Sequence, residues 1–278
     1  METTSSRGHH GSAIEWLDTH FQAAQAEYLE ILGASGIQRG WQVLDAGAGS
    51  GSFLPFLAEM VGPDGAITAL DLAPENIDAI ERRAAEQGFP CTLATDVGSV
   101  TALPFLPHAF DAVWCANVTL YLSDDDIAET LRHFQRVVRP GGLVAIKDVD
   151  LGMARLNPAP YGFFWHFLEA SNNAGRPVHV HGALRSQYLK RMMERVGFIA
   201  VRQHTTLIER WAPLRSVERA YLAGILKFFA DHALVLDLPA VDRPIWEALA
   251  RNDDTSPLNN PDFYWCEGSV LAVGRVPT

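Results

Sequence analysis

The sequence is short of positive charge and of long apolar runs, and each shortage excludes a class of protein. Its 278 residues include 22 Lys and Arg against 33 Asp and Glu, giving a formal net charge of −11 at pH 7. An acidic chain without a dense basic cluster repels a phosphate backbone, so we expect no nucleic acid partner. No run approaches the roughly 18 apolar residues of a membrane span, and no basic segment precedes an apolar one near the start. We therefore expect a cytoplasmic protein without membrane contact.

Cysteine is equally sparse. The chain has 3 cysteines, Cys91, Cys115 and Cys266. They are too few and too scattered for a disulfide framework or a zinc site. Two of them lie within apolar runs, so we expect buried free thiols.

What the sequence does contain is a series of short apolar runs that alternate with helical patterns. The runs that predict strands are WQVLDAG (41–47), GAITALD (65–71), PCTLATD (90–96), FDAVWCANV (110–118) and LVAIKDVD (143–150). One of the helical patterns between them begins at Ser123, a good N-cap, and ends before Gly141 and Gly142. Such alternation predicts βαβ units, that is, a parallel sheet with helices on both faces.

The segments on either side of these units have other patterns. Apolar residues at helical spacing predict one amphipathic helix over residues 12–32, with Ser12 as a possible N-cap. Beyond residue 150 an aromatic and histidine-rich stretch breaks the alternation, and a helix and a strand then resume it up to residue 211. A helical insertion precedes a last strand over 262–276. The two insertions could pack together as a cap.

A glycine-rich loop follows the first predicted strand. Within VLDAGAGSGSF, three glycines stand at alternate positions, Gly47, Gly49 and Gly51. A dinucleotide fingerprint would place the third glycine one residue later, where this chain has Ser52. Asp45 also puts a carboxylate where a pyrophosphate would be disfavoured and a cation attracted. The loop therefore favours a cationic amino acid headgroup or a sulfonium, although a glycine turn without a ligand stays open.

Polar residues also end the next three predicted strands. Asp71 could accept hydrogen bonds from both hydroxyls of a ribose. Asp96 could accept from the exocyclic amine of adenine, while the backbone amide of Val97 donates to a ring nitrogen. Asn117 would lie beside the bound headgroup. Each residue alone is typical of a cap or turn, but the series at successive strand ends is hard to assign to capping.

These stretches resemble class I S-adenosylmethionine-dependent methyltransferases, in particular the UbiE/Coq5-like small-molecule enzymes. VLDAGAGSGSF is similar to their first motif, ALDLAPENI to the acidic second-strand loop, ATDVGSVTALPF to the adenine loop, and FDAVWCANVTLYL and LRHFQRVVRPGGLVAI to the segments that follow. The resemblance covers about residues 40–150. It implies an α/β fold with a Rossmann-like sheet of seven strands, whose last strand runs antiparallel.

The resemblance also implies a cofactor, S-adenosyl-L-methionine, and the residues that bind it. These are Asp45, Gly47, Gly49 and Gly51 at the methionine portion, Asp71 and Leu72 at the ribose, Asp96 and Val97 at the adenine, and Asn117 and Val118 beside the transferred methyl. The chain would then divide into an N-terminal helical lid (1–39), a cofactor-binding core (40–150), a cap insertion (151–183), a continuation of the core (184–211), a helical insertion (212–260) and a final strand (261–278).

The reaction implied is an in-line displacement that moves a methyl group to carbon, nitrogen or oxygen of a small molecule. The aromatic residues of the C-terminal half favour a flat acceptor, indole-like or phenolic; they are Phe163, Phe164, Trp165, Trp211, Tyr264 and Trp265. A quinone, polyketide or sugar methyltransferase is an alternative. An NAD-dependent oxidoreductase, against which Ser52 argues, and a non-catalytic S-adenosylmethionine-binding protein stay open, as does the oligomeric state.

Candidate catalytic residues lie outside the cofactor motifs. Tyr28 on the N-terminal helix and His166 in YGFFWHFLEA are the candidate bases. The candidate substrate contacts are Tyr121, Trp165, His179 and His181. The last two share one face of VHVH if that segment is extended.

Two further pairs of polar residues suggest other roles. His9 and His10 could be recruited by a folding lid. Asp148 and Asp150 resemble the acid near a strand end in metal-dependent catechol methyltransferases. Neither this pair nor the alternating histidines have further ligands at a suitable spacing, so we expect no metal.

Overall fold

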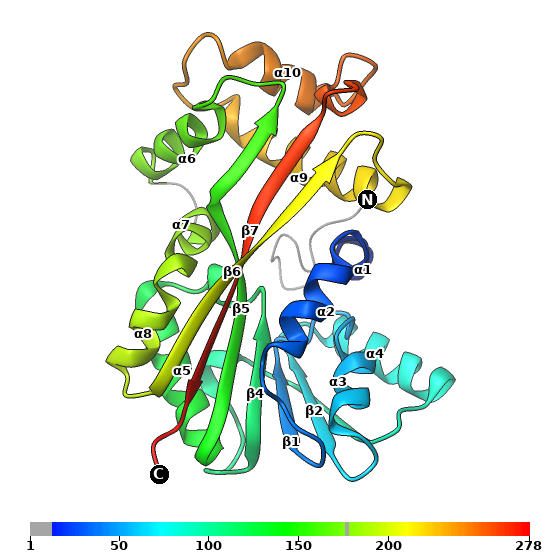
Figure 1. The fold of residues 1–278 in the computed structure, drawn as a ribbon, viewed down its shortest axis with the longest axis vertical. Helices are drawn as coiled ribbons and strands as arrows, with labels where there is room; N and C mark the ends of the chain where they lie inside the picture. Colours follow the sequence, from blue (N-terminus) through cyan, green and yellow to red (C-terminus); the bar gives the residue numbers. More distant parts are fainter. Residues whose placement is uncertain (1–12, 176–177) are drawn as a thin grey trace.

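The computed structural model describes residues 13–175 and 178–278, which form a seven-stranded sheet with helices on both faces (Figure 1). The strands are β1 (Gln42–Ala46), β2 (Ala66–Asp71), β3 (Thr92–Val97), β4 (Phe110–Ala116), β5 (Val138–Asn157), β6 (Ile199–Trp211) and β7 (Tyr264–Arg275). Their order is β3-β2-β1-β4-β5-β7-β6. The first five strands pair in parallel, and β7 runs antiparallel between β5 and β6. The predicted fold class, with its antiparallel last strand, is confirmed.

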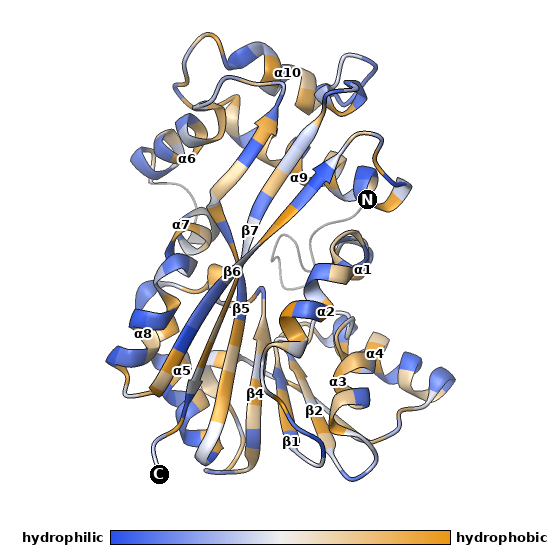
Figure 2. Cartoon of the chain, in the orientation of Figure 1, coloured by the Kyte–Doolittle hydropathy of each residue, from blue (hydrophilic) through white to orange (hydrophobic). Residues whose placement is uncertain are grey.

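Apolar helix faces build a core on each side of the sheet. On one side lie α1 (Ile14–Ala23), α2 (Gln25–Gly33), α3 (Leu54–Val61) and α4 (Pro74–Gln87), and on the other α5 (Asp124–Val137) and α8 (Leu189–Arg195). In α5, Ile127, Leu131 and Phe134 are fully buried at helical spacing. Its N-cap is Ser123, whose Oγ accepts a hydrogen bond from the amide of Asp126 at 3.1 Å. Figure 2 shows the resulting contrast between hydrophobic central strands and helices with mixed faces.

Strands β5, β7 and β6 continue past the ends of the other strands into what we call the upper lobe (Figure 1). This lobe also contains α6 (Phe163–Asn173), α9 (Ser216–Ala233) and α10 (Arg243–Arg251), and one apolar cluster joins them. The expected boundary at residue 150 falls inside β5, because the strand continues after an irregularity between Asp150 and Arg155. Leu151 and Leu156 beyond it are buried in the lobe. The lobe is thus an extension of the sheet itself.

The N-terminal segment forms two helices, and the prediction of a single helix was wrong. The backbone leaves the helical conformation at Ala24, with φ −121° and ψ 18°. Arg210 of β6 donates from its Nε to the Ala23 carbonyl at 3.2 Å and pairs with Glu27 at 2.7 Å. This long-range contact satisfies the end of α1, and the local apolar pattern contains no sign of it. Ser12 lies outside the described residues.

Shorter elements complete the chain. They are α7 (Val178–Arg185) and the 3₁₀ turns Val100–Ala102, Thr119–Tyr121, Ser186–Tyr188 and Pro257–Asn259. The three cysteines are unpaired. None of the described helices is long and apolar enough to cross a membrane.

Candidate functional site

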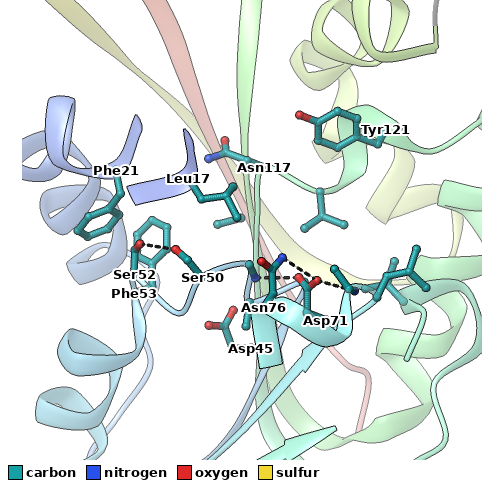
Figure 3. Close-up of a pocket in the computed structure, with 18 of the residues that line it drawn as sticks. Leu17, Phe21, Asp45, Ser50, Ser52, Phe53, Asp71, Asn76, Asn117 and Tyr121 are labelled. Atoms are coloured by element: carbon teal, nitrogen blue, oxygen red, sulfur yellow. Dashed lines mark hydrogen bonds between the residues drawn. The ribbon is translucent and has the colours of Figure 1, made fainter. Parts of the chain in front are cut away.

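A cavity of about 210 Å³ lies at the carboxyl ends of β1, β2, β3 and β4, between the glycine loop and helices α1 and α2 (Figure 3). Parallel strands bring the residues that follow them to one edge of the sheet, where ligands of α/β proteins bind. The cavity wall includes seven of the residues predicted to bind the cofactor: Asp45, Gly47, Gly49, Asp71, Leu72, Asn117 and Val118. It also includes two of the other predicted site residues, Tyr28 and Tyr121.

The glycine loop forms the floor of this cavity. Gly47 and Gly49 have φ values of +82° and +55°, in the left-handed region that favours glycine. A Cβ on Gly47 would clash with Val118, and one on Gly49 would lie 3.0 Å from Leu17 Cδ1. Gly51 does not line the cavity, because it turns towards α4, where its Cβ would lie 2.7 Å from Ile80 Cγ1. We infer that Gly51 lets the loop pack against that helix.

Helix α1 is fastened to the same loop by a cluster of polar side chains. Asp18 Oδ1 accepts hydrogen bonds from Ser50 Oγ at 2.6 Å and Ser52 Oγ at 3.1 Å. Arg83 of α4 pairs with Asp18 and donates to the Ser50 carbonyl at 2.8 Å. The cluster therefore holds α1 over the cavity, and Ser52 has a structural use at the position where a dinucleotide site would have glycine.

Two carboxylates mark one end of the cavity. Asp71 accepts from the amides of Gly49 at 2.8 Å and Ala73 at 2.9 Å, which fixes its side chain at the end of β2. Asp45 is 2% exposed, and its Oδ2 hydrogen bonds to no residue in the described part of the chain. Burial, and secondarily the charge of Asp71, raises the pKa of Asp45 to about 8. A buried acceptor of this kind is costly without a partner, so the site fits a ligand that brings a positive charge and hydroxyls.

The predicted adenine contacts lie next to the cavity. Asp96 and Val97 end β3, and Val97 is 44% exposed. The cavity wall at this point consists of Gly98, Ser99 and Val100. The roles of Asp96 and Val97 stay predictions.

The opposite end of the cavity, which we call the acceptor end, joins residues from distant parts of the chain. Tyr28 of α2 is 2% exposed, and its Oη lies 2.7 Å from Nε2 of His20 on α1. Burial and the nearby Lys147 lower the pKa of His20 to about 3, so its imidazole is neutral. The His20 ring stacks on Tyr221 of α9 with centroids 4.7 Å apart. Tyr28 was expected here, whereas His20 and Tyr221 were not.

A buried lysine lies behind this end. Lys147 of β5 is 1% exposed, donates from Nζ to Asn117 Oδ1 at 2.6 Å, and places Nζ 3.8 Å from the Tyr28 ring centroid. Burial lowers its pKa to about 7, against the opposing attraction of Asp148 and Glu267. Glu267 of β7 is also buried and accepts from Tyr221 Oη at 3.3 Å. Lys147 and Glu267 could have been noticed as charged residues inside apolar strand patterns, because a charge buried in a strand needs a buried partner.

The other predicted catalytic residue lies elsewhere. His166 Nδ1 is 2.6 Å from Oδ2 of Asp242, a buried residue at the start of α10, so the contact fastens α6 to α10. Trp165 is 54% exposed on α6. Neither belongs to the cavity wall. The structure therefore does not bring His166 or Trp165 together with the predicted cofactor residues.

The VHVH segment is helical, which corrects the expectation of an extended one. Helix α7 spans Val178–Arg185, so the extended spacing on which a shared face of the two histidines depended is absent. His181 lies 3.4 Å from Asp124, on the outer surface. The side chain of His179, and His9 and His10, lie outside the described residues. Among the described residues, no three His, Cys, Asp or Glu are grouped so that they could hold a metal ion.

The aromatic residues on which the expected substrate class was based serve mainly in packing. Phe163, Phe164 and Trp265 are buried in the upper lobe, and Trp211 packs on Tyr264 with ring centroids 4.3 Å apart. The rings that do line the cavity are those of His20, Phe21, Tyr28, Phe53 and Tyr121. An aromatic acceptor bound in the cavity would contact rings among these five.

The strand order, the antiparallel β7 and the cavity at the strand ends define the fold of the class I methyltransferases. Residues 43–142 match the family model of the methyltransferase domain. The solved structure of the YcgJ protein from Bacillus subtilis is similar with a TM-score of 0.59 and 17% identity, over 91% of this chain and 99% of that one. The [4+2]-cyclase SpnF is similar with a TM-score of 0.53 and 19% identity, over 92% and 82%. At these identities the likeness concerns the fold alone.

Several of the curated relatives are named methyltransferases. The UbiE C-methyltransferase of Hahella chejuensis is 30% identical over 41% of this chain and 45% of that protein. The erythromycin 3''-O-methyltransferase of Saccharopolyspora erythraea is 27% identical over 77% and 73%. For the first relatives the match spans only about half of their length or less, from 39% to 52%. Residues 43–142 therefore form a methyltransferase domain on the fold of the class I S-adenosylmethionine-dependent methyltransferases, whose cofactor is S-adenosylmethionine.

Proposed function

We propose that the protein transfers a methyl group from S-adenosylmethionine to a small molecule bound at the acceptor end of the cavity. The observation that carries this proposal is the pair of carboxylates at the ends of β1 and β2. Asp45 presents a buried oxygen that no described residue satisfies, and Asp71 stands fixed at the neighbouring strand end. A ligand with a cationic amino acid portion and a ribose satisfies both, whereas a pyrophosphate would be repelled by Asp71 and would bring no positive charge to Asp45.

Each part of the cofactor has its own residues in this proposal. Gly47 and Gly49 let the backbone approach the methionine portion beside Asp45, and Gly51 shapes the loop. Asp71 and Leu72 hold the ribose, and Asp96 and Val97 read the adenine from the rim. Asn117 and Val118 lie next to the methyl group. When bound, the cofactor supplies a methyl group activated by the sulfonium, so the chain has mainly to align the acceptor and exclude water.

Helices α1 and α2 contribute this alignment. Leu17, Phe21 and Tyr28 cover the cavity from one side and exclude water from it. Correct alignment of two reactants supplies roughly 7 to 11 kcal/mol of a barrier. The lid therefore accounts for much of the catalysis that the chain itself has to provide.

The acceptor is proposed to be small and flat, indole-like or phenolic, with methylation at carbon, nitrogen or oxygen. Phe21, Phe53 and Tyr121 support this class, because aromatic walls favour an apolar ring. The alternative is a polyketide, quinone or sugar acceptor. It is supported by the relative that is named an erythromycin 3''-O-methyltransferase and aligns over 77% of this chain.

Two measurements test the proposal. Calorimetric titration of the protein with S-adenosylhomocysteine and with NAD⁺ should give binding by the first compound only. Incubation with methyl-labelled S-adenosylmethionine and a panel of indoles, phenols, quinones and sugars should label a small molecule. Binding of NAD⁺ alone would favour an oxidoreductase, and S-adenosylhomocysteine binding without transfer to any acceptor would favour a non-catalytic binding protein. Label on the protein alone would contradict a small-molecule acceptor.

A further inference from the structure

We propose that the group methylated is a neutral hydroxyl, and that Tyr28 takes its proton while passing its own proton to Nε2 of His20. This inference rests on the proposed methyl transfer and specifies the acceptor atom and the residues that serve it. It is carried by the geometry of the acceptor end, in which one chain of hydrogen bonds fixes every donor and acceptor.

The contact between Tyr28 and His20 depends on the break between α1 and α2. Residues eight apart in a continuous helix would be separated by roughly 12 Å along its axis. Because the chain turns at Ala24, His20 Nε2 lies 2.7 Å from Tyr28 Oη, and both side chains line the cavity. Arg210 holds this turn by its bonds to the Ala23 carbonyl. The break therefore has a specific result, a pair of hydrogen-bonded side chains facing the cavity.

The direction of the hydrogen bonds follows from Lys147. Lys147 Nζ donates to the carbonyl Oδ1 of Asn117 at 2.6 Å, and this bond orients the Asn117 amide. Burial raises the pKa of Tyr28 and Asn117 opposes this rise, as an amide nitrogen that donates to the Tyr28 oxygen would. Having accepted from Asn117, the Tyr28 hydroxyl gives its own proton to His20 Nε2. The neutral His20 is therefore the tautomer with its proton on Nδ1.

Charge at this end favours a neutral acceptor. The polar side chains in the wall are His20, Tyr28, Asn117 and Tyr121, and the described part of the wall has no carboxylate there. An ammonium acceptor would find no carboxylate in the described part of the wall at this end. A carboxylate acceptor would find the Lys147 amino group already engaged by Asn117 Oδ1. A hydroxyl needs only what the wall offers, an acceptor for one proton.

The step balances with the groups present. A lone pair of the hydroxyl oxygen forms the bond to the methyl carbon as the bond from that carbon to sulfur breaks, and sulfur keeps the electron pair. The hydroxyl proton passes to Tyr28 Oη, whose own proton passes to His20 Nε2. The products are a methyl ether, a neutral thioether and an imidazolium that returns its proton to water. A weak base suffices, because an oxygen that gains a methyl group before losing its proton becomes strongly acidic.

The test combines a structural readout with activity. In protein labelled with ¹⁵N-histidine, Nε2 of His20 should resonate as an unprotonated acceptor at pH 7, and Tyr28→Phe should shift this resonance. Transfer to a hydroxyl acceptor should fall by about 10²- to 10⁴-fold in Tyr28→Phe and His20→Gln, the range for loss of acid–base catalysis. S-adenosylhomocysteine affinity should stay within about threefold, since neither side chain holds the carboxylate end. Tyr161→Phe and His204→Gln, at exposed positions outside the cavity wall, are the matched controls.

The outcomes separate this inference from the proposed function. A protein that does not bind S-adenosylhomocysteine contradicts the proposed function itself. A protein that binds it and methylates only amines, carboxylates or carbon overturns the hydroxyl inference alone. An Nε2-protonated His20 overturns the proton path even if no acceptor in the panel reacts. Full activity of His20→Gln on a hydroxyl acceptor would overturn it as well.

Discussion

The two ends of the cavity are built in different ways. At the cofactor end, Asp45, Gly47 and Asp71 lie on turns that directly follow strands, so each is placed by the few residues around it. At the acceptor end, His20, Tyr28 and Lys147 come from two helices and a strand separated by more than a hundred residues, and they meet only through tertiary packing. Local motifs are therefore enough to predict the cofactor. The residues proposed to act on the acceptor are brought together only by long-range packing.

The ends also differ in charge. Asp71 gives the cofactor end a negative charge, and Asp45 adds a second one when it loses its proton. At the acceptor end the charges of Lys147 and Glu267 lie behind the wall and offset each other. Substitutions at the two ends should therefore have separable effects, one on cofactor affinity and the other on turnover.

The largest effect on cofactor affinity is expected at the cofactor end. Asp71→Ala removes the acceptor for two loop amides and for the ribose hydroxyls, so S-adenosylhomocysteine affinity should fall by at least about 100-fold, since each hydrogen bond to a charged group contributes roughly 1.5 to 3 kcal/mol. Titration calorimetry measures this, with the exposed Asp64→Ala as control. Unchanged affinity in Asp71→Ala would remove the basis for the ribose assignment.

A smaller effect, of another kind, is expected from Lys147→Met. This change leaves Asn117 free to turn, so kcat should fall by about 10- to 100-fold, the equivalent of one charged hydrogen bond. The affinity for S-adenosylhomocysteine should stay within about threefold of the parent protein. The exposed Lys227→Met serves as control.

The double variant Lys147→Met with Glu267→Gln separates positioning from folding. Glu267 without Lys147 is a buried charge with less compensation, so the single variant should also unfold at a lower temperature. The double variant should recover much of this thermal stability and none of the kcat. Recovery of kcat together with stability would mean that Lys147 acts only on folding.

The dependence of cofactor affinity on pH is a third way to distinguish the contribution of the cofactor end from that of the acceptor end. Because the pKa of Asp45 in the free protein is raised to about 8, its carboxyl holds a proton at pH 7. A bound cation lowers that pKa and releases the proton, so affinity should rise about tenfold between about pH 6.5 and pH 8. Calorimetry in buffers of different ionisation enthalpy counts the proton released, and Asp45→Asn should abolish both effects.

The stability of the folded protein depends on pH in the opposite direction to the cofactor affinity. The folded protein without ligand binds this proton more tightly than the unfolded chain does, so its stability falls as pH rises from about 4 to about 8. Asp45→Asn should remove this fall, which thermal unfolding at several pH values measures. An unchanged pH profile in that variant would show that another group is responsible.

The smallest effect concerns exchange of the cofactor. Asp18→Asn weakens the contact that holds α1 against Arg83 and the glycine loop, so S-adenosylhomocysteine should dissociate about two- to fivefold faster, as expected for a partly exposed ion pair. Stopped-flow displacement measures the rate. Asp231→Asn, which breaks an exposed pair with Lys227, should leave it unchanged. Equal rates in both variants would mean that α1 does not limit exchange.

Much of the fold followed from local pattern. The alternation of apolar runs and helical patterns located all five parallel strands of the core, and the family resemblance supplied the antiparallel β7. The break at Ala24 was missed because Arg210, nearly two hundred residues away, stabilises it. The strand predicted over 143–150 was ended too early, because an irregularity between Asp150 and Arg155 interrupts β5 before it continues into the upper lobe.

The candidate site, like the fold, was predictable where it depends on local sequence patterns. Strand-end spacing and family motifs predicted seven residues that line the cavity, and their roles in binding the cofactor stay predictions. His166 and the buried aromatic residues were misleading, because histidine and aromatic side chains serve packing as readily as catalysis. The sequence around His20 gave no sign of its contact with Tyr28. In a continuous helix these two side chains would lie too far apart to hydrogen bond.

The most direct measurement is a crystal structure of the protein with S-adenosylhomocysteine. The ribose hydroxyls should contact Asp71, the amino acid portion should lie beside Asp45 and Gly47, and the sulfur should point towards Asn117 and Tyr28. S-adenosylhomocysteine bound outside this cavity, or with its sulfur directed away from the acceptor end, would contradict the account.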